Sequence, residues 1–250
     1  MNIAVCVKQV PDTETRIKLN EDKKSIDESE INFILNPYDE FAVEEALKLK
    51  EANGGEVTII SLGPDRITSS IRSALAMGAD KAMQIKADTI PVDPMVTAKA
   101  LAEVLKEGNY NVILLGKQAI DDDNSQIGPV LGELLNMATM NVVTKLEVSG
   151  DNVTAHRQIE GGAEKVEAKL PVIITTQRGL NEPRYASLKG IMAAKKIQIE
   201  EKTVSLDSDQ IEIVEFSYPP QKPEGKIVGE GADAVPELIR LLKEEAKVIS

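Results

Sequence analysis

The 250-residue chain has one cysteine, one histidine, no tryptophan, three Phe and four Tyr. A lone thiol, Cys6, excludes an internal disulfide and cannot complete a thiolate metal site. A lone imidazole, His156, excludes every mechanism that needs two. The sequence also contains neither a phosphate-loop lysine motif nor a GxGxxG fingerprint. The sequence therefore lacks the residues of most known catalytic sites, and we expect no metal site.

Positive charge is also scarce, because 29 Lys+Arg against 41 Asp+Glu give a net charge of −12. This balance disfavours a nucleic-acid partner, and the few aromatic rings offer little for base stacking. No apolar run approaches the length of a membrane span, and the start, MNIAVCVKQV, carries no cleavage pattern. We therefore expect a cytoplasmic protein without membrane insertion, in a reducing compartment.

The first 116 residues alternate short β-rich segments with helical patterns. The β-rich segments cover residues 2–7, 56–62, 81–86 and 111–115. Helices are expected from Asn36-Pro37 to Gly54, from about Asp65 to Gly78, and from Asp93-Pro94 to Gly108. Near-continuous apolar strands between helices are typical of a parallel sheet that is covered on both faces. The long polar connection 8–36 is expected to be a surface excursion.

The pattern changes after Asn136. Residues 142–148, 153–158 and 164–169 alternate polar and apolar side chains around glycine-rich turns, which predicts antiparallel strands added to the sheet. Residues 171–176 predict one more buried strand. Beyond residue 197 no periodicity is sustained until a helix at 236–247, so this part is expected to be an arm that docks on its own core or on a partner. The fold class is α/β, with a mostly parallel, doubly wound sheet, added antiparallel strands and an extended C-terminal arm.

Ligands of an open parallel sheet bind beyond the carboxyl ends of its strands. The segments that reach this edge are Cys6-Val7-Lys8, Leu62-Gly63-Pro64 and the loop from Gly116 to Pro129. In that loop, polar side chains at 124–126 begin a helix, and a helix start favours an anion such as phosphate. Three successive aspartates, 121–123, would repel a phosphate there unless they point outward, cap the helix or bind a ribose hydroxyl. An acidic, solvated turn without a ligand is an equally good interpretation.

Other candidates have plainer interpretations from the residues alone. Asn36 is favoured as a helix cap, and Cys6 as a small buried side chain. His156 is favoured as a surface or hydrogen-bonded histidine rather than a base. Residues 157–162 could position a ligand charge, but a hairpin with exposed charges is the plainer interpretation.

Several motifs together resemble one family, the β subunit of electron transfer flavoprotein. They are Val7-Lys8-Gln9-Val10-Pro11-Asp12, Asn36-Pro37-Tyr38, Ala42-Val43-Glu44-Glu45-Ala46, Ala74-Leu75-Ala76-Met77-Gly78-Ala79-Asp80, Gly116-Lys117-Gln118-Ala119-Ile120-Asp121-Asp122-Asp123, Leu170-Pro171, Leu180-Asn181-Glu182-Pro183-Arg184-Tyr185-Ala186-Ser187-Leu188 and Ile191-Met192. They span about the first 200 residues in order, and the last 50 match only loosely.

The resemblance implies a Rossmann-like sheet of the adenine nucleotide alpha hydrolase type, with a nucleotide-binding domain at 1–196 and an arm at 197–250 that packs on a partner α subunit. It implies a heterodimeric electron carrier without catalytic residues of its own, in which α holds most of a shared FAD and β binds AMP structurally. The implied cofactor contacts are Cys6, Asn36, Pro37, Tyr38, Asp39, Leu62, Gly63, Gly116, Lys117, Gln118, Ala119, Ile120, Asp121, Asp122, Asp123, Asn124, Ser125, Gln126 and Ile127. Ser125 and Ile127 replace residues that are commonly Asn and Thr, which main-chain contacts would tolerate.

The resemblance also implies a docking segment for acyl-CoA dehydrogenases of fatty acid oxidation, or for other flavin dehydrogenases. Its residues are Asn181, Glu182, Pro183, Arg184, Tyr185, Ala186, Ser187, Leu188, Ile191 and Met192. Leu188 would be the apolar anchor, which suits the weak, quickly released association of an electron shuttle. The alternative places Leu188 in the core of this chain.

Two other functions stay open. A bifurcating branch of the family replaces AMP with a second FAD, and its loop usually reads Asp-Gly-Asp-Thr. Here Asp121-Asp122-Asp123-Asn124 has a side chain where that glycine would be, which favours AMP, although Gln126-Ile127-Gly128-Pro129 partly matches the bifurcating pattern. A stand-alone nucleotide-binding module of the universal-stress type is the other alternative.

Overall fold

The computed structural model describes residues 1–221 and 224–249, which form two compact units, Met1–Glu215 and Phe216–Ser250. Residues 222–223 and 250 of the predicted arm lie outside the described residues. No helix in the described part is long and apolar enough to cross a membrane. The predicted division at residue 196 concerns partner contacts and stays a prediction.

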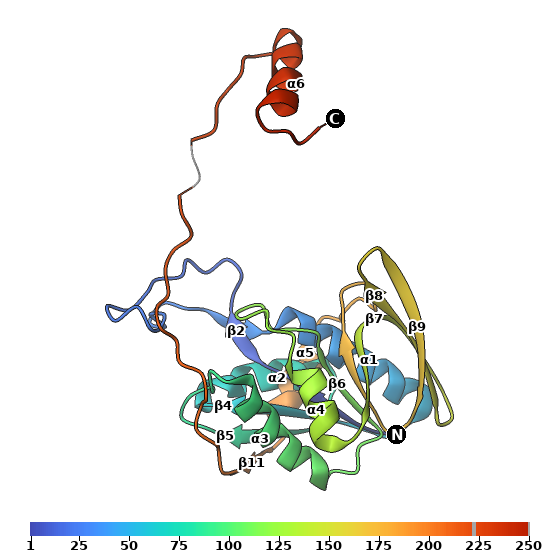
Figure 1. The fold of residues 1–250 in the computed structure, drawn as a ribbon. Helices are drawn as coiled ribbons and strands as arrows, with labels where there is room; N and C mark the ends of the chain where they lie inside the picture. The colour runs from blue at the N-terminus through green and yellow to red at the C-terminus, as the bar shows by residue number, and fades with distance from the viewer. Residues whose placement is uncertain (222–223, 250) are drawn as a thin grey trace. The chain divides into compact units, whose positions relative to one another are not determined.

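The first unit is built on a nine-stranded sheet in the order β11-β5-β4-β1-β6-β10-β7-β8-β9 (Figure 1). The strands are β1 (Asn2–Cys6), β4 (Glu56–Gly63), β5 (Lys81–Lys86), β6 (Val112–Gly116), β7 (Ala138–Ser149), β8 (Asn152–Ile159), β9 (Gly162–Lys169), β10 (Val172–Thr176) and β11 (Ile199–Lys202). Neighbours from β11 to β7 pair in parallel, and β7, β8 and β9 pair antiparallel. The predicted mostly parallel sheet with added antiparallel strands is confirmed.

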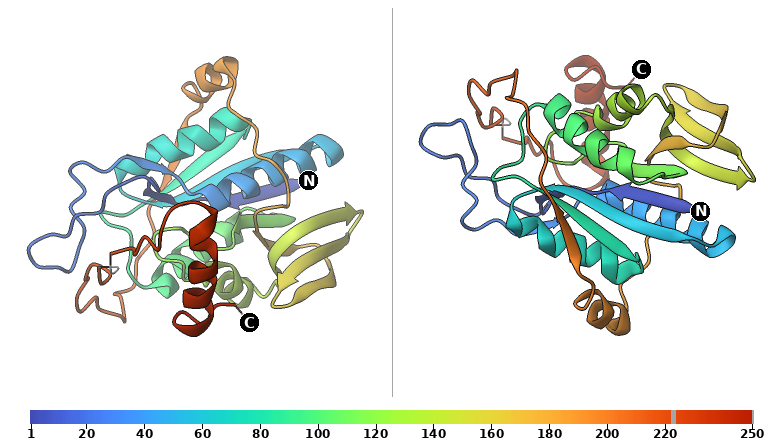
Figure 2. Two further views of the ribbon diagram at one scale, coloured as in Figure 1. Left: turned by 90° about the horizontal axis from the view of Figure 1, so that it is seen from above. Right: turned by 90° about the horizontal axis from the view of Figure 1, so that it is seen from below.

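Helices cover both faces of the sheet (Figure 2). They are α1 (Pro37–Asn53), α2 (Thr68–Met77, after a 3-10 turn at Asp65–Ile67), α3 (Pro94–Glu107), α4 (Ile127–Leu135) and α5 (Leu188–Ala194). Side chains of α1 and α2 belong to one hydrophobic cluster, and those of α3 and α4 to the other. The chain runs from β1 through β4 to β5 and then returns to the other side of β1. Because parallel crossovers are right-handed, this reversal moves the following helices to the opposite face.

The central strands form as predicted because their apolar side chains pack on both faces of the sheet. In β1, Ile3 and Val5 lie in one cluster, whereas Ala4 and Cys6 lie in the other. The start of α3 also forms as predicted, since the Asp93 carboxylate accepts the Met95 N–H at 2.8 Å.

Three short strands escaped the sequence analysis. The strands β2 (Gln9–Pro11) and β3 (Phe33–Leu35) form a two-stranded sheet where the 8–36 excursion leaves and rejoins the core. The strand β11 extends the main sheet next to β5. Strands of three or four residues are too short to show an alternation, so pairing with distant segments decides them.

The second unit contains a 3-10 turn (Ala232–Ala234) and α6 (Val235–Glu244). This helix was predicted, but it ends three residues before the expected Lys247. Arg240 pairs with Glu237 at 2.8 Å and with Glu244 at 2.7 Å on its surface.

Candidate functional site

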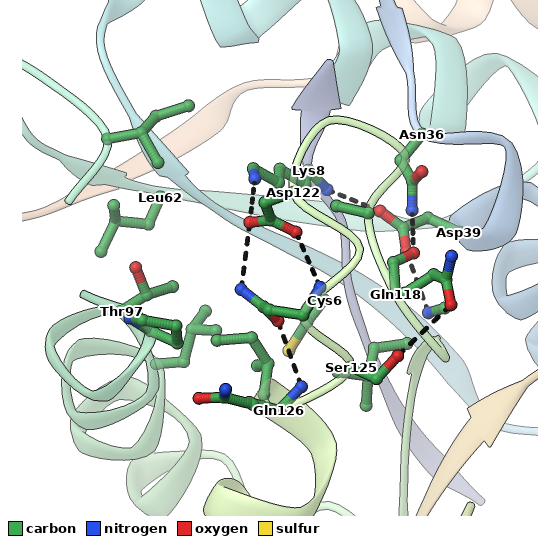
Figure 3. A pocket seen from close by; sticks show the side chains of 18 of the residues that line it. Cys6, Lys8, Asn36, Asp39, Leu62, Thr97, Gln118, Asp122, Ser125 and Gln126 are labelled. Carbon is green, nitrogen blue, oxygen red and sulfur yellow. Dashed lines mark hydrogen bonds and ion pairs between the residues drawn. The ribbon is translucent and has the colours of Figure 1, made fainter. Parts of the chain in front are cut away.

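A cavity lies at the carboxyl ends of β1, β4 and β6, where the strand order reverses (Figure 3). This is the position at which open parallel sheets bind ligands. The empty space at this position, with the open solvent at its mouth included, is ≈ 750 Å³.

Most predicted cofactor contacts meet in this cavity. Those that line it are Cys6, Asn36, Asp39, Leu62, Gly116, Lys117, Gln118, Ala119, Asp122, Asn124, Ser125, Gln126 and Ile127. Other predicted contacts are adjacent but do not line it, namely Pro37, Tyr38, Gly63, Ile120, Asp121 and Asp123. Val7 and Lys8 also line it, in a segment that the sequence placed at this edge. The lining residues that sequence reasoning missed are Ile90, Pro91, Val92, Pro94, Thr97, Leu101 and Leu115.

Asp39, in the first turn of α1, joins the two strands that diverge at the floor of the cavity. Its Oδ2 accepts the backbone N–H of Lys8 at 2.7 Å, and its Oδ1 accepts that of Gly116 at 2.9 Å. Burial raises the pKa of Asp39 to about 7, although these bonds, the Asn36 amide and the charge of Lys8 lower it. A buried carboxyl group that changes charge near neutrality therefore holds β1 and β6 together.

Asn36 occupies the N-cap position of α1, but the predicted capping bond is wrong. Among the described residues its side chain makes no cap bond. Its amide instead donates to the Gln118 carbonyl at 3.0 Å and accepts the Ile120 N–H at 3.3 Å. The turn after β6 supplies better-placed partners than the helix does, so Asn36 fixes that turn over the cavity.

Cys6, at the end of β1, contributes an unreactive apolar surface. It is buried, and this burial together with the nearby charge of Asp39 raises the pKa of its thiol to about 12. The thiol is therefore protonated at neutral pH and is a weak nucleophile. With Leu62, Leu101 and Leu115 it forms an apolar wall.

The acid turn, Asp121–Asp123, is held by partners on both sides of the cavity mouth. Lys8 Nζ lies 2.8 Å from Asp121 Oδ1 and 3.0 Å from Asp122 Oδ2. Asp122 also accepts the Asn124 side-chain amide at 3.1 Å, and Asp123 pairs with the Gln118 amide. All three aspartates are exposed, and their side chains make these ion pairs and hydrogen bonds at the cavity mouth. Within residues 1–221 and 224–249, no group of three or more His, Cys, Asp or Glu side chains is placed to hold a metal ion.

The start of α4 adds backbone donors to the same mouth. Gln126 is its N-cap residue and, within the described part of the chain, makes no side-chain cap bond. The first N–H groups of a helix have no partner within the helix, and Pro129 has no N–H. The N–H groups of Ile127 and Gly128 are therefore the first-turn donors that an anion could use.

The missed wall of the cavity comes from residues 90–97, between β5 and α3. Asp209 accepts the N–H of Val92 at 3.3 Å and that of Asp93 at 3.1 Å, and Asp93 accepts the Gln210 N–H at 3.1 Å. Residues 90–97 follow a strand end, so the rule that located the other loops also applies to them. Their bonds to a segment more than a hundred residues away could not be predicted.

The predicted docking segment is fastened to the middle of α1. The Arg184 guanidinium donates to both oxygens of Glu44, at 2.8 and 2.9 Å, and to Glu51 at 2.6 Å. The Asn181 amide donates to Glu45 at 2.9 Å. Glu44 and Glu45 are buried, at 6% and 5% exposed, so these bonds are shielded from water. The Arg184 side chain is itself 36% exposed, so it joins a buried carboxylate of α1 to the surface of the segment.

Beyond Arg184 the segment presents apolar side chains to solvent. Tyr185 is 99% exposed and Leu188 79% exposed, and the next turn of α5 adds Ile191 and Met192. Ser187 begins α5 by accepting the Gly190 N–H at 3.0 Å. The exposure of Leu188 excludes the alternative that places it in the core. Its docking role stays a prediction.

The hairpin candidates lie elsewhere. His156 is on β8, opposite Lys145 of β7 and Lys165 of β9. Arg157 pairs with Glu164 across the hairpin at 3.4 Å. None of these side chains lines the cavity.

Comparisons with known proteins agree over the whole chain. A family model described as the electron transfer flavoprotein domain matches residues 24–207. A protein of Bacillus subtilis named electron transfer flavoprotein subunit beta is 41% identical, with 100% of both chains covered. Proteins of the same name are 40% identical in Syntrophomonas wolfei (99% of this chain, 98% of the relative) and 41% identical in Bradyrhizobium diazoefficiens (100% of both).

Proposed function

The chain belongs to the electron transfer flavoprotein β-subunit family, and on this basis we propose that its cavity binds AMP as a structural ligand while an α subunit holds most of a shared FAD. Members of this family are electron carrier subunits rather than catalysts. The family assignment also removes the alternative of a stand-alone nucleotide-binding module. The observation that supports AMP most strongly is the cavity itself, because its apolar wall and polar mouth suit the two ends of a nucleotide.

The residues present fit the parts of AMP. The apolar wall at Cys6, Leu62 and Leu101 would contact the adenine ring. The side chains of Asp122 and Gln126 would reach the ribose and the phosphate, and the N–H groups at the start of α4 would take phosphate oxygens. No residue here needs to move a proton, so the contribution of this chain would be to bind and orient.

When bound, FAD supplies the redox chemistry. Tyr38 would border the flavin, and it is half-buried beside the cavity with Lys117 Nζ 5.2 Å from its ring centroid. The docking segment would bring a flavin dehydrogenase, such as an acyl-CoA dehydrogenase, close to that flavin through Leu188. A small exposed apolar surface around one leucine suits an association that must be released quickly.

The geometry of the acid turn favours AMP over a second FAD in this chain. Asp122, which stands where the bifurcating pattern has glycine, lines the mouth and is tied to Lys8. A side chain at this position would leave less room for a longer dinucleotide than the glycine of the bifurcating pattern would.

Cofactor content tests the proposal. The full chain is purified together with its α subunit, nucleotides are released with acid and separated by chromatography, and flavin is counted by absorbance. We expect AMP and about one FAD per heterodimer. A second flavin in place of AMP would support the bifurcating alternative, and a complex without AMP would refute the structural nucleotide.

A variant locates the site. Asp122→Ala with Gln126→Ala removes two polar groups of the mouth and should lower the AMP content without changing the FAD content. Glu103→Ala with Lys106→Ala, both exposed on α3, is the matched control and should retain AMP. Full AMP retention by the first variant would place the nucleotide elsewhere.

A further inference from the structure

Lys8 connects the floor of the cavity to its mouth, and it is not among the expected cofactor contacts. Its backbone N–H donates to Asp39 at 2.7 Å, and its side-chain Nζ reaches Asp121 at 2.8 Å and Asp122 at 3.0 Å. The side chains of Lys8 and Asp121 are each 27% exposed, and that of Asp122 is 42% exposed. The two ion pairs are therefore partly shielded from water and are stronger than pairs on an open surface.

The single positive charge of Lys8 faces two negative charges, those of Asp121 and Asp122. Burial lowers the pKa of Lys8, but the charges of Asp121 and Asp122 and their hydrogen bonds outweigh it, so the pKa lies above its ordinary value. The ammonium group is thus charged at neutral pH. Without it, two carboxylates would face the mouth of the cavity unpaired, beside the helix start that would receive a phosphate.

We propose that Lys8 is a positioning residue that sets the electrostatics of this cavity by holding the acid turn over the mouth and offsetting its charge, so that an anionic nucleotide can enter. The inference rests on the proposed nucleotide site and adds a charge requirement to it. Lys117 also lines the cavity, but it lies over Tyr38 and does not bridge the acid turn in the described structure.

If Lys8 acts through its charge, its replacement should weaken AMP and adenosine binding to different extents, whereas a purely structural role should weaken both equally. Methionine at position 8 keeps the backbone N–H that bonds Asp39 and most of the apolar stem, but removes the charge. If Lys8 offsets charge, the loss should weaken binding of AMP far more than binding of uncharged adenosine. If Lys8 only tethers the turn, both ligands should weaken together.

The experiment titrates AMP and adenosine into the full chain, complexed with its α subunit and stripped of nucleotide, by calorimetry at low and at physiological salt. We expect Lys8→Met to weaken AMP binding by about tenfold or more, with a smaller loss at high salt, and to change adenosine binding by less than about threefold. The triple variant Lys8→Met/Asp121→Asn/Asp122→Asn should recover AMP affinity, because the unpaired charges are gone while the polar side chains stay.

Lys50→Met is the matched control, because Lys50 forms a similarly shielded pair with Asp80 at 2.6 Å outside the cavity. Its affinity for both ligands should be unchanged. Asp121→Asn alone keeps the inference testable should Lys8→Met fail to fold, and it should bind AMP at least as tightly as the unaltered chain does.

Equal losses for AMP and adenosine in Lys8→Met, a triple variant as weak as Lys8→Met, or weaker AMP binding by Asp121→Asn would each overturn the charge role. Failure of the unaltered chain to bind AMP is a distinct result, since it would refute the nucleotide site itself and this inference with it.

Discussion

Replacing Arg184 by methionine would loosen the docking segment from α1, leaving the Asn181 amide bonded to Glu45 at 2.9 Å. Its guanidinium is the group that joins residues 181–187 to both Glu44 and Glu51. Methionine has a similar length and fills similar space, so the change mainly removes charge and donors. Glu44, which is 6% exposed, would then lose its charged partner and keep only the backbone N–H of residue 184, at 3.1 Å.

The size of the effect follows from the exposure of each partner. Removing one member of a buried ion pair costs about 3–5 kcal/mol, because the other charge is left uncompensated. The Arg184 side chain is itself 36% exposed, so water recovers part of this loss. The Glu51 side chain is 58% exposed, and its pairing adds less than about 1 kcal/mol. We therefore expect Arg184→Met to lower the free energy of unfolding by about 2–3 kcal/mol.

Two measurements check this expectation. Urea unfolding gives the free energy, and hydrogen exchange gives the protection of backbone amides in residues 185–192. The variant should lose protection there while amides of β1 and β6 keep theirs. Glu51→Gln is the matched control, because it removes only the exposed partner and should cost less than about 0.5 kcal/mol.

A double variant identifies the cause. Glu44→Gln with Arg184→Met removes both charges, so it should be more stable than Arg184→Met alone. If Arg184→Met costs no more than Glu51→Gln, or if residues 185–192 keep their protection, the segment is not held by this pair.

Three further predictions concern single positions. Leu188→Ala should change the free energy of unfolding by less than about 0.5 kcal/mol, because Leu188 is 79% exposed. It should nevertheless slow electron transfer from an acyl-CoA dehydrogenase, and an unchanged rate would contradict the anchor role. Gly116→Ala should cost about 1–3 kcal/mol and empty the cavity of AMP, since its Cβ would lie 2.5 Å from Asp39 Oδ1 and 2.6 Å from Tyr38 Cβ; stable AMP-loaded protein would contradict it. Because burial raises the pKa of Asp39 from 3.8 to about 7, the folded state holds a proton that the unfolded state releases, so stability should fall by at most about 4 kcal/mol between pH 4 and 7. The free energy of unfolding, measured with urea across this pH range, should depend less on pH in Asp39→Asn than in the unaltered chain. An equal pH dependence would count against the raised pKa of Asp39.

The sequence predicted the sheet and its edge well because these depend on local patterns. The strands β1, β4 and β6 are mostly apolar, and the reversal of strand order places their ends at one cavity. The polar loop after β6 stood out by composition alone. The sequence therefore predicted where the site lies in the fold, but not which residues bond to one another there.

The bonds that escaped prediction join residues far apart in sequence. Asn36 has the composition of a cap, yet its side chain bonds a turn more than eighty residues away. Glu44 and Glu45 lie in a helix where charge usually marks the solvent side, and only the return of residues 181–184 buries them. Propensity describes a residue's neighbours in the chain, whereas tertiary packing decided these cases.

Helix α1 carries both candidate sites, and this allows their roles to be separated. Its first turn supplies Asp39 to the cavity, and Glu44, five residues on, supplies the partner of Arg184 about 7.5 Å further along the axis. A 17-residue helix packed on the sheet is rigid at this scale, so releasing the docking segment should leave the Asp39 bonds to Lys8 and Gly116 in place. Arg184→Met should therefore retain AMP while docking weakens. Loss of AMP in that variant would show that the two sites are energetically coupled through the helix.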